Sequence, residues 1–288
     1  MTSDWNRTRT DYDDDGTSRI HAALLSIAGI LGEDLMQDVV LVGGLVPRLH
    51  FPTVPTGVAP HVGTRDIDLA LQLSIFDEAR YADIARHLKH AGLTPDTNIR
   101  DDGTETLTQA RWKIGEGGTP VLIDFVMARP ENEERKAGSV KHLGNDLGAY
   151  IMDALVMTAT DHVSMKLDGQ NLKGETTQQT IKVVGLATFV VLKALAIANR
   201  RKLKDVYDLC WVLEAAGPKV IGAQFKAHSP SDHTTKALEI LGTKFQSPTH
   251  EGPSWAVEFE QGPNAKDEAR AQDIVGLVTQ FIRAAIES

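Results

Sequence analysis

The chain has a single cysteine, Cys210, among its 288 residues, so an internal disulfide is excluded. Because Cys210 lies in an apolar helical pattern, we expect it to be a small core residue rather than a nucleophile. No apolar run approaches the ~20 residues that a membrane-spanning helix needs. The polar, acidic N-terminus also lacks the apolar segment of a signal peptide. These absences predict a cytoplasmic protein with no membrane segment.

Basic charge is also scarce. Lysine and arginine together number 30 against 39 aspartates and glutamates, which gives a formal net charge of -9. This balance argues against a protein that coats nucleic acid through a broadly basic surface, although a local basic groove stays open. The densest basic cluster is "NRRKLKD", residues 199–205. We interpret Arg200, Arg201 and Lys204 either as a patch for a nucleic-acid acceptor or as a solvated helix junction.

Several familiar catalytic and metal-binding motifs are missing. The sequence contains no HExxH, CxxC, GxSxG or Walker A pattern, and His50, His61 and His90 share no metal-ligand spacing with a cysteine. His61 precedes an aspartate-bearing segment and is a candidate to line a site there, but we expect it to be a surface loop residue.

The pattern of apolar and turn residues predicts an α+β fold. Residues 1–18 are expected to be a disordered tail, because aspartate, threonine and serine dominate there. Residues 19–184 alternate helix and strand signals around a mixed β-sheet with flanking helices, and residues 185–288 form a helical C-terminal region. Residues 45–63 hold four prolines, each of which would cost ~3 kcal/mol inside a helix, so we predict a loop.

Two aspartates open a predicted strand at "DIDLALQL", residues 66–73. Residues two apart on a strand face the same side, so Asp66 and Asp68 project together, while Ile67 projects to the opposite side. Carboxylates held this close repel one another unless a cation binds, one of them is protonated or water surrounds them. Magnesium is the cation that turns this repulsion into function. A solvated strand end, with Arg65 and Arg111 as ion-pair partners, is the alternative.

A third carboxylate lies in "VLIDFVM", where Asp124 interrupts an apolar strand. An ionised aspartate in such a strand is costly unless it is hydrogen-bonded, paired or bound to metal. If this strand lies beside that of Asp66, three carboxylates converge at one place in the sheet. Such a trio can hold two Mg²⁺ ions roughly 3.5–4 Å apart, as in two-metal phosphoryl and nucleotidyl transfer enzymes.

These segments resemble the nucleotidyltransferase superfamily: "LVGG" at 41–44, "TRDIDLAL" at 64–71, and a later apolar strand that carries Asp124. Further on, "VVLKALAIANRRKLKDVYDL" at 190–209 is similar to the Lys…Arg…Lys-Asp-x-x-Asp-Leu block of the AbiEii/AbiGii family. Those proteins are nucleotidyltransferase-like toxins of bacterial abortive-infection and toxin–antitoxin systems. The stretch between the glycines and the aspartates is longer than is usual in such enzymes. It would form a lid, form part of a substrate groove, or displace the glycine turn from the carboxylates.

The resemblance implies a role for each matching residue. The aspartates would hold Mg²⁺, the glycines would let the backbone approach the phosphates of a nucleoside triphosphate, and the lysine of the second block would contact the triphosphate. The metal ligands are Asp66, Asp68 and Asp124; the nucleotide contacts are Gly43, Gly44, Thr64, Arg65 and Lys193; the catalytic set joins Lys193 and Asp208 to the three ligands.

The function implied is a Mg²⁺-dependent transfer of a nucleoside monophosphate from NTP to an acceptor. The resembled family points to RNA, particularly the 3′ end of tRNA, and to a toxic outcome that an antitoxin relieves. A protein hydroxyl and a small molecule stay open as acceptors. A module of the same fold that binds a nucleotide or a partner protein without turnover is the alternative hypothesis.

Overall fold

The computed structural model describes residues 6–72, 78–99, 105–115, 120–131 and 133–287. Its contacts divide the chain into two compact units. The sheet unit consists of Asp14–Val46 and Thr64–Val184. The helical unit consists of Pro47–Gly63, the described residues before Asp14, and those from Gly185 onward. The predicted fold class, a mixed sheet with flanking helices followed by a helical C-terminal region, is confirmed.

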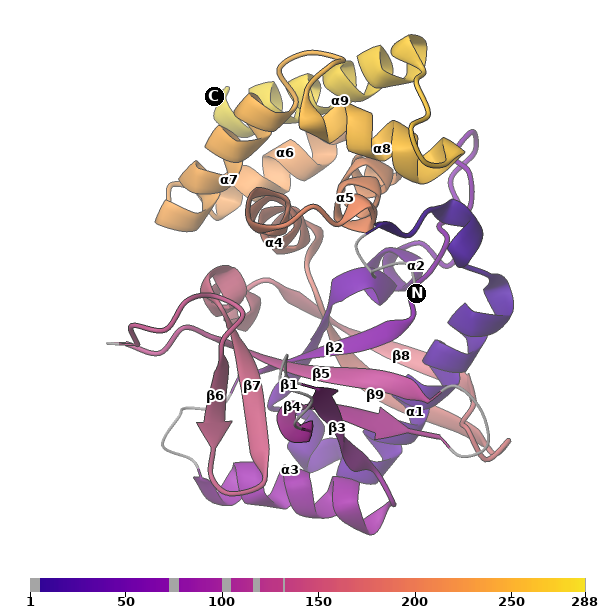
Figure 1. Cartoon of the computed structure of the whole chain (residues 1–288), viewed down its shortest axis with the longest axis vertical. Coiled ribbons are helices and arrows are strands. Elements are labelled where there is room, and N and C mark those ends of the chain that lie inside the picture. Colours follow the sequence, from indigo (N-terminus) through magenta and orange to yellow (C-terminus); the bar gives the residue numbers. More distant parts are fainter. Residues whose placement is uncertain (1–5, 73–77, 100–104, 116–119, 132, 288) are drawn as a thin grey trace. The chain divides into compact units, whose positions relative to one another are not determined.

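Within the described residues, nine strands of the sheet unit form one mixed sheet (Figure 1). Seven of them follow the order β3-β4-β5-β2-β1-β9-β8, and β7 pairs with both β5 and β6. The strands are β1 (Val39–Val42), β2 (Asp66–Leu71), β3 (Thr94–Ile99), β4 (Glu105–Ile114), β5 (Val121–Ala128), β6 (Val140–Leu143), β7 (Leu147–Met152), β8 (His162–Gln170) and β9 (Thr176–Val184). Helix α1 (Asp14–Met36) packs on β8 and β9, and α3 (Glu78–His90) lies beside α1.

The centre of the sheet is built from its most apolar strands. All four residues of β1 are buried, and β2 lies between β1 and β5, antiparallel to the first and parallel to the second. A strand in the middle of a sheet is covered on both faces, which explains the near-continuous apolar runs of β1 and β5. The two aspartates at the start of β2 are the exception, and they lie half-buried where the apolar pattern is interrupted.

Within the tail 1–18 predicted to be disordered, the residues that the structure describes, 6–18, include helical structure. Helix α1 begins at Asp14, and a 3₁₀ turn covers Arg9–Asp11. The Thr8 amide donates to Asp11 Oδ2 at 2.7 Å, and the ring of Tyr12 lies 5.8 Å from that of Phe259 on α8. Local capping and one aromatic contact therefore order residues whose composition alone predicts disorder.

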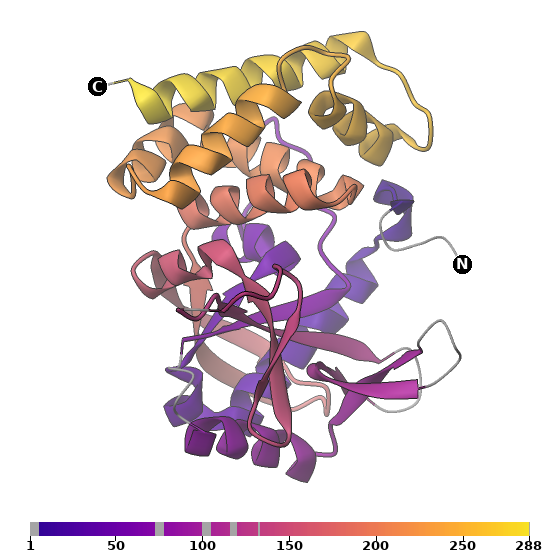
Figure 2. The ribbon, with the colours of Figure 1, turned by 60° about the vertical axis from the view of Figure 1, so that its left-hand side comes forward.

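The helical unit contains α4 to α9, and α9 runs across α6 (Figure 2). A Cβ added at Gly222 would lie 2.5 Å from Ala284 Cβ, so glycine is needed where these two helices meet. Ser231 and Asp267 are the N-caps of α7 and α9, because each accepts a backbone amide of the first turn. The helices are α4 (Leu186–Asn199), α5 (Leu203–Ala216), α6 (Pro218–Ala227), α7 (Asp232–Lys244), α8 (Glu251–Gln261) and α9 (Glu268–Ile286).

The proline-rich segment Pro47–Gly63, called the strap below, belongs by its contacts to the helical unit, whereas the predicted boundaries 19–184 place it in the α/β domain. It begins within the short helix α2 (Val46–His50) and then crosses α5 without regular structure. Trp211 Nε1 donates to the Ala59 carbonyl at 2.8 Å, and the Val62 amide donates to the Tyr207 hydroxyl at 3.2 Å. These long-range contacts, which no local pattern reveals, account for its place.

Among the described residues, no helix combines the length and apolar character that crossing a membrane requires.

Candidate functional site

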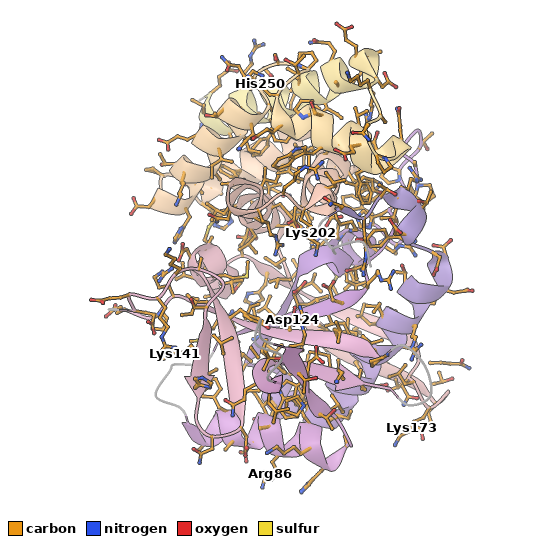
Figure 3. The ribbon with its side chains drawn as sticks, viewed as in Figure 1. Arg86, Asp124, Lys141, Lys173, Lys202 and His250 are labelled. Atoms are coloured by element: carbon orange, nitrogen blue, oxygen red, sulfur yellow. The ribbon has the colours of Figure 1, made fainter. Side chains whose placement is uncertain are left out.

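The three aspartates come together because β2 and β5 are neighbours. In their parallel pairing Asp68 lies directly opposite Asp124, and Asp66 precedes Asp68 by two residues on the same side of the strand. One carboxylate oxygen from each of the three lies within 4.8 Å of the others. Asp124 lies within the sheet of this unit (Figure 3). The predicted neighbourhood of the two strands is thus confirmed, and three acidic groups share one small region.

We call Asp66, Asp68 and Asp124 the carboxylate row. A basic residue from the next strand lies beside it. Arg111 on β4 lies opposite Asp124, and its Nε and Nη2 donate to Asp124 Oδ1 and Oδ2, both at 2.6 Å. This bidentate pair raises the pKa of Arg111, so its guanidinium stays charged. The pair also compensates the cost of burying the Asp124 carboxylate. From the sequence, either a hydrogen bond or a metal could have done so.

The glycine turn lies against the same carboxylates. Strand β1 pairs antiparallel with β2 so that Val42 lies opposite Asp68, and Gly43 follows immediately in a 3₁₀ turn, Gly43–Leu45. A Cβ added at Gly43 would lie 1.8 Å from Asp68 Oδ2. The long spacer therefore does not displace the turn, because strand pairing places Gly43 and the strap departs afterwards. The neighbouring Gly44 is buried.

The other predicted phosphate contacts lie at the entry to β2. Thr64 is buried, and its hydroxyl donates to Asp66 Oδ1 at 2.7 Å, which fixes the orientation of that carboxylate. Arg65 is exposed and precedes the strand. Tyr150 on β7 is a further neighbour of Asp124 that no sequence motif singles out, and its pKa is raised by burial and then by the charge of Asp124. No local signal could have found it, since β7 reaches β5 only through the sheet topology.

The donor set of this row fits a hard divalent cation. Carboxylate oxygens are the ligands that Mg²⁺ prefers, and each oxygen can accept more than one bond, so the contacts from Thr64 and Arg111 leave capacity for a metal. The geometry brings the three donors close enough to share an ion. Asp66, Asp68 and Asp124 are therefore the residues that would hold it.

A second group of charged side chains lies in the helical unit. Lys193 on α4 donates to Asp205 Oδ1 at 2.8 Å and to Asp208 Oδ2 at 2.7 Å. Lys204 donates to Asp208 Oδ1, one helical turn away on α5. His61 of the strap lies 2.9 Å from the same oxygen. All five residues are buried, and we call them the buried charge cluster: His61, Lys193, Lys204, Asp205 and Asp208.

Comparison with known proteins identifies the family. Residues 32–278 match the model of the nucleotidyl transferase AbiEii toxin of type IV toxin–antitoxin systems. The chain belongs to this family. The structure is similar to that of MenT4, a nucleotidyltransferase toxin from Mycobacterium tuberculosis H37Rv, with 16% identity, a TM-score of 0.38 and coverage of 93% of this chain and 89% of that chain. No curated protein matches the sequence.

Membership of the AbiEii family makes this chain a nucleotidyltransferase of the toxin class, as its motifs had predicted. The matched region includes both the carboxylate row and the buried charge cluster. Among the predicted site residues, the structure brings Asp66, Asp68 and Asp124 together in the sheet unit. It brings Lys193 and Asp208 together in the helical unit. A joint role for the two groups in one reaction stays a prediction.

Opposing charges dominate the buried charge cluster of this AbiEii-family chain. Burial lowers the pKa of Lys193, but Asp205 and Asp208 outweigh that effect and hold it above its usual value. For Lys204 burial prevails, and its pKa is lowered. Burial alone would raise the pKa of Asp208, but the two lysines depress it well below the usual range. The two aspartates and Lys193 therefore stay charged, while burial works against the charge of Lys204.

Two sequence expectations for this region are wrong. Lys204 is not part of a surface patch, since its ammonium group is buried against Asp208; Arg200 and Arg201 instead pair with Asp205 and Glu258. The turn between α4 and α5, where this basic cluster lies, can be located in Figure 3 by the label of Lys202. His61 is not a surface loop residue, because only 2% of it is exposed. Burial in both cases depends on partners distant in sequence or on helix packing, which charge composition does not reveal.

Replacing Gly43 with alanine tests the close approach of the turn to Asp68. Gly43 has φ 79°, where an L-residue costs about 1–2 kcal/mol, and the added Cβ would also collide with the carboxylate. We expect Gly43→Ala to reduce transferase activity about tenfold or more, because displacing a catalytic group by a fraction of an ångström has effects of this size. Steady-state kinetics on the purified variant would measure it.

Gly92→Ala is the matched control for this prediction. Gly92 belongs to the same unit and has φ 82°, but its added Cβ would meet nothing within 4 Å. The control carries the same backbone strain without the collision, so it should lose stability and keep its activity. Equal activity losses in the two variants would contradict the assigned contact.

Proposed function

We propose that this chain is a Mg²⁺-dependent nucleotidyltransferase that transfers a nucleoside monophosphate from NTP to RNA, with the 3′ end of tRNA as its target. The observation that supports it most is the direct pairing of Asp68 with Asp124, beside Asp66 and against Gly43. Family membership supplies the class of reaction, and the carboxylate row supplies the chemistry that this reaction needs.

Each residue of the row has a task in this proposal. Asp66, Asp68 and Asp124 hold Mg²⁺, which when bound supplies the positive charge that a triphosphate and its transition state require. Thr64 orients Asp66 through its hydroxyl, and Arg111 orients Asp124 through two hydrogen bonds. Two ions are proposed, and the phosphates of the bound NTP would contribute negative charge for the second.

The nucleotide contacts follow from the backbone around the row. Without a Cβ, Gly43 brings the backbone of its turn against the Asp68 carboxylate, where that backbone can meet phosphate oxygens, and Gly44 continues the same turn. Thr64 and Arg65 stand at the start of β2, next to the first aspartate. Lys193 is proposed as the triphosphate contact and Asp208 as its catalytic partner, a role that requires the buried charge cluster to meet the nucleotide during the reaction.

The toxin class suggests the biological setting of this activity. A type IV system pairs the toxin with an antitoxin, so we propose an antitoxin that relieves the effect of RNA modification in the cytoplasm. The overall charge of -9 is mildly unfavourable for an RNA acceptor. Arg200 and Arg201 provide the local positive charge at the α4–α5 turn.

Labelled nucleotides test this function. We expect protein incubated with each α-labelled NTP, Mg²⁺ and total RNA to place the label in RNA of tRNA size and to release pyrophosphate. Chelation by EDTA should abolish both signals, and excess Mg²⁺ should restore them. Label in protein or in a small molecule would redirect the acceptor.

Nucleotide binding in calorimetry without pyrophosphate release would favour the second candidate, a binding module without turnover. The feature of the structure that favours that candidate is the Arg111–Asp124 pair, which satisfies Asp124 without a metal.

A further inference from the structure

His61 is the strap residue that reaches the buried charge cluster. Its ring is stacked on Tyr207, with centroids 5.2 Å apart, and meets Trp211 edge-on at 5.0 Å. Arg48 holds the His61 carbonyl with Nε at 3.0 Å and Nη2 at 2.8 Å. The ring and its backbone are therefore held by three separate residues.

The hydrogen bonds of the imidazole define which nitrogen carries the proton. The Gly63 amide donates to Nδ1 at 3.0 Å, so Nδ1 is an acceptor. The proton then resides on Nε2, which donates to Asp208 Oδ1 at 2.9 Å. A neutral histidine of one tautomer thus supplies a hydrogen bond and no charge.

The cations around the imidazole explain why a neutral donor is suited to this place. Lys204 shares Asp208 with His61, and Arg200 already joins Lys193 at Asp205. Burial and the charge of Lys204 lower the pKa of His61 to about 4, although Asp208 opposes this effect. Arg48 also lowers it. The imidazole therefore stays neutral near pH 7 among the groups that face it.

We propose that His61 is a positioning residue for nucleotidyl transfer: its Nε2–H fixes Asp208, and through Asp208 the ammonium group of Lys193. Asp208 Oδ1 accepts from His61 and Lys204, while Oδ2 accepts from Lys193. Of these three donors His61 alone comes from outside α4 and α5, so its hydrogen bond ties the carboxylate that holds Lys193 to the strap. The strap between the glycine turn and β2 thus brings a positioning group to α5. This inference rests on the proposed function, because it assigns Lys193 and Asp208 to the reaction.

Three variants separate positioning from general stability. His61→Gln keeps an N–H near the Nε2 position, whereas His61→Asn places its amide near Nδ1, too far from Asp208. Trp211→Phe removes the hydrogen bond to Ala59 and so loosens the strap, but it keeps an aromatic ring against His61 and should preserve the His61–Asp208 bond. We expect His61→Asn to lower kcat about tenfold with the KM for NTP within about twofold, the usual size for a residue that orients a reacting group. His61→Gln should recover most of the loss, and Trp211→Phe should keep kcat.

The proposal is overturned if His61→Asn keeps the wild-type kcat, or if His61→Gln is no better than His61→Asn. A loss in Trp211→Phe as large as that in His61→Asn would also overturn it, since strap stability would then explain both.

A second measurement keeps the test independent of the acceptor. If wild-type protein transfers nothing to any acceptor, the proposed function fails, but nitrogen-15 NMR of the Lys193 ammonium group still reports its position. We expect a resolved Lys193 signal in wild type, His61→Gln and Trp211→Phe, and its loss by exchange with water in His61→Asn. A Lys193 signal that persists unchanged in His61→Asn would contradict the positioning role.

Discussion

Replacing Asp68 with asparagine is expected to reduce the rate of nucleotidyl transfer about 10³-fold, while the protein becomes no less stable. Asp68 is the central carboxylate of the row, paired in register with Asp124 and in contact range of the Gly43 turn. Asparagine keeps the shape of the side chain but removes the negative charge that a divalent cation needs. Single-turnover kinetics with labelled NTP would measure the rate.

The same substitution should not lower the stability of the protein, although it lowers the rate. Like charges directly opposite each other on paired strands destabilise a sheet, so neutralising Asp68 should leave the free energy of unfolding unchanged or raise it. Urea denaturation of the variant and wild type would measure that difference. Loss of rate together with retained stability marks a group kept for function rather than for folding.

Asp168→Asn is the matched control for this experiment. Asp168 is also an aspartate on a strand of the sheet unit, but it lies exposed on β8, the last strand in the sheet order, where it accepts from Gln178. The control removes one charge from the same unit and should keep the wild-type rate. A rate for Asp68→Asn within about threefold of the control would show that the row has no catalytic role; threefold is about 0.6 kcal/mol in the barrier.

Replacing Asp208 with alanine is expected to lower the free energy of unfolding by about 3–5 kcal/mol, the size found when one partner of a buried ion pair is removed. Asp208 is fully buried and accepts from His61, Lys193 and Lys204. Its removal leaves two buried ammonium groups with a single aspartate, Asp205. Urea denaturation followed by tryptophan fluorescence would measure the loss.

Two further variants test the cause of that loss. Asp273→Asn removes an exposed carboxylate from α9 of the same unit and should change stability by less than about 0.5 kcal/mol. Adding Lys204→Met to Asp208→Ala removes one of the stranded charges and should recover part of the stability. If the double variant is less stable than Asp208→Ala by the full effect of Lys204→Met alone, the two residues are not coupled and the electrostatic explanation is wrong.

The chemistry of the carboxylate row could be predicted from sequence because it depends on local patterns. The period of two on a strand places Asp66 and Asp68 on one side, and the cost of a buried charge singles out Asp124. Those two arguments needed only the assumption that β2 and β5 are neighbours, which the register confirms. Arg111 was named as an ion-pair partner, but its bidentate contact with Asp124 follows from the position of β4.

The contacts of the strap and the presence of the edge strand β3 could not be predicted from local patterns. The contact between His61 and Asp208 joins residues 147 positions apart, and no periodicity or composition encodes it. Strand β3, "TPDTNI", holds a proline and mostly polar residues, so it lacks an apolar alternation. It forms only because β4 offers an antiparallel edge. Tertiary partners decide both cases.

The most direct test of a metal-binding carboxylate row is the anomalous scattering of manganese in crystals soaked with Mn²⁺, which replaces Mg²⁺ at oxygen ligands. We predict a manganese peak bonded to oxygens of Asp66, Asp68 and Asp124, and its absence in crystals of Asp68→Asn treated identically. A wild-type map with no manganese at these residues, or an equal peak in Asp68→Asn, would contradict the account.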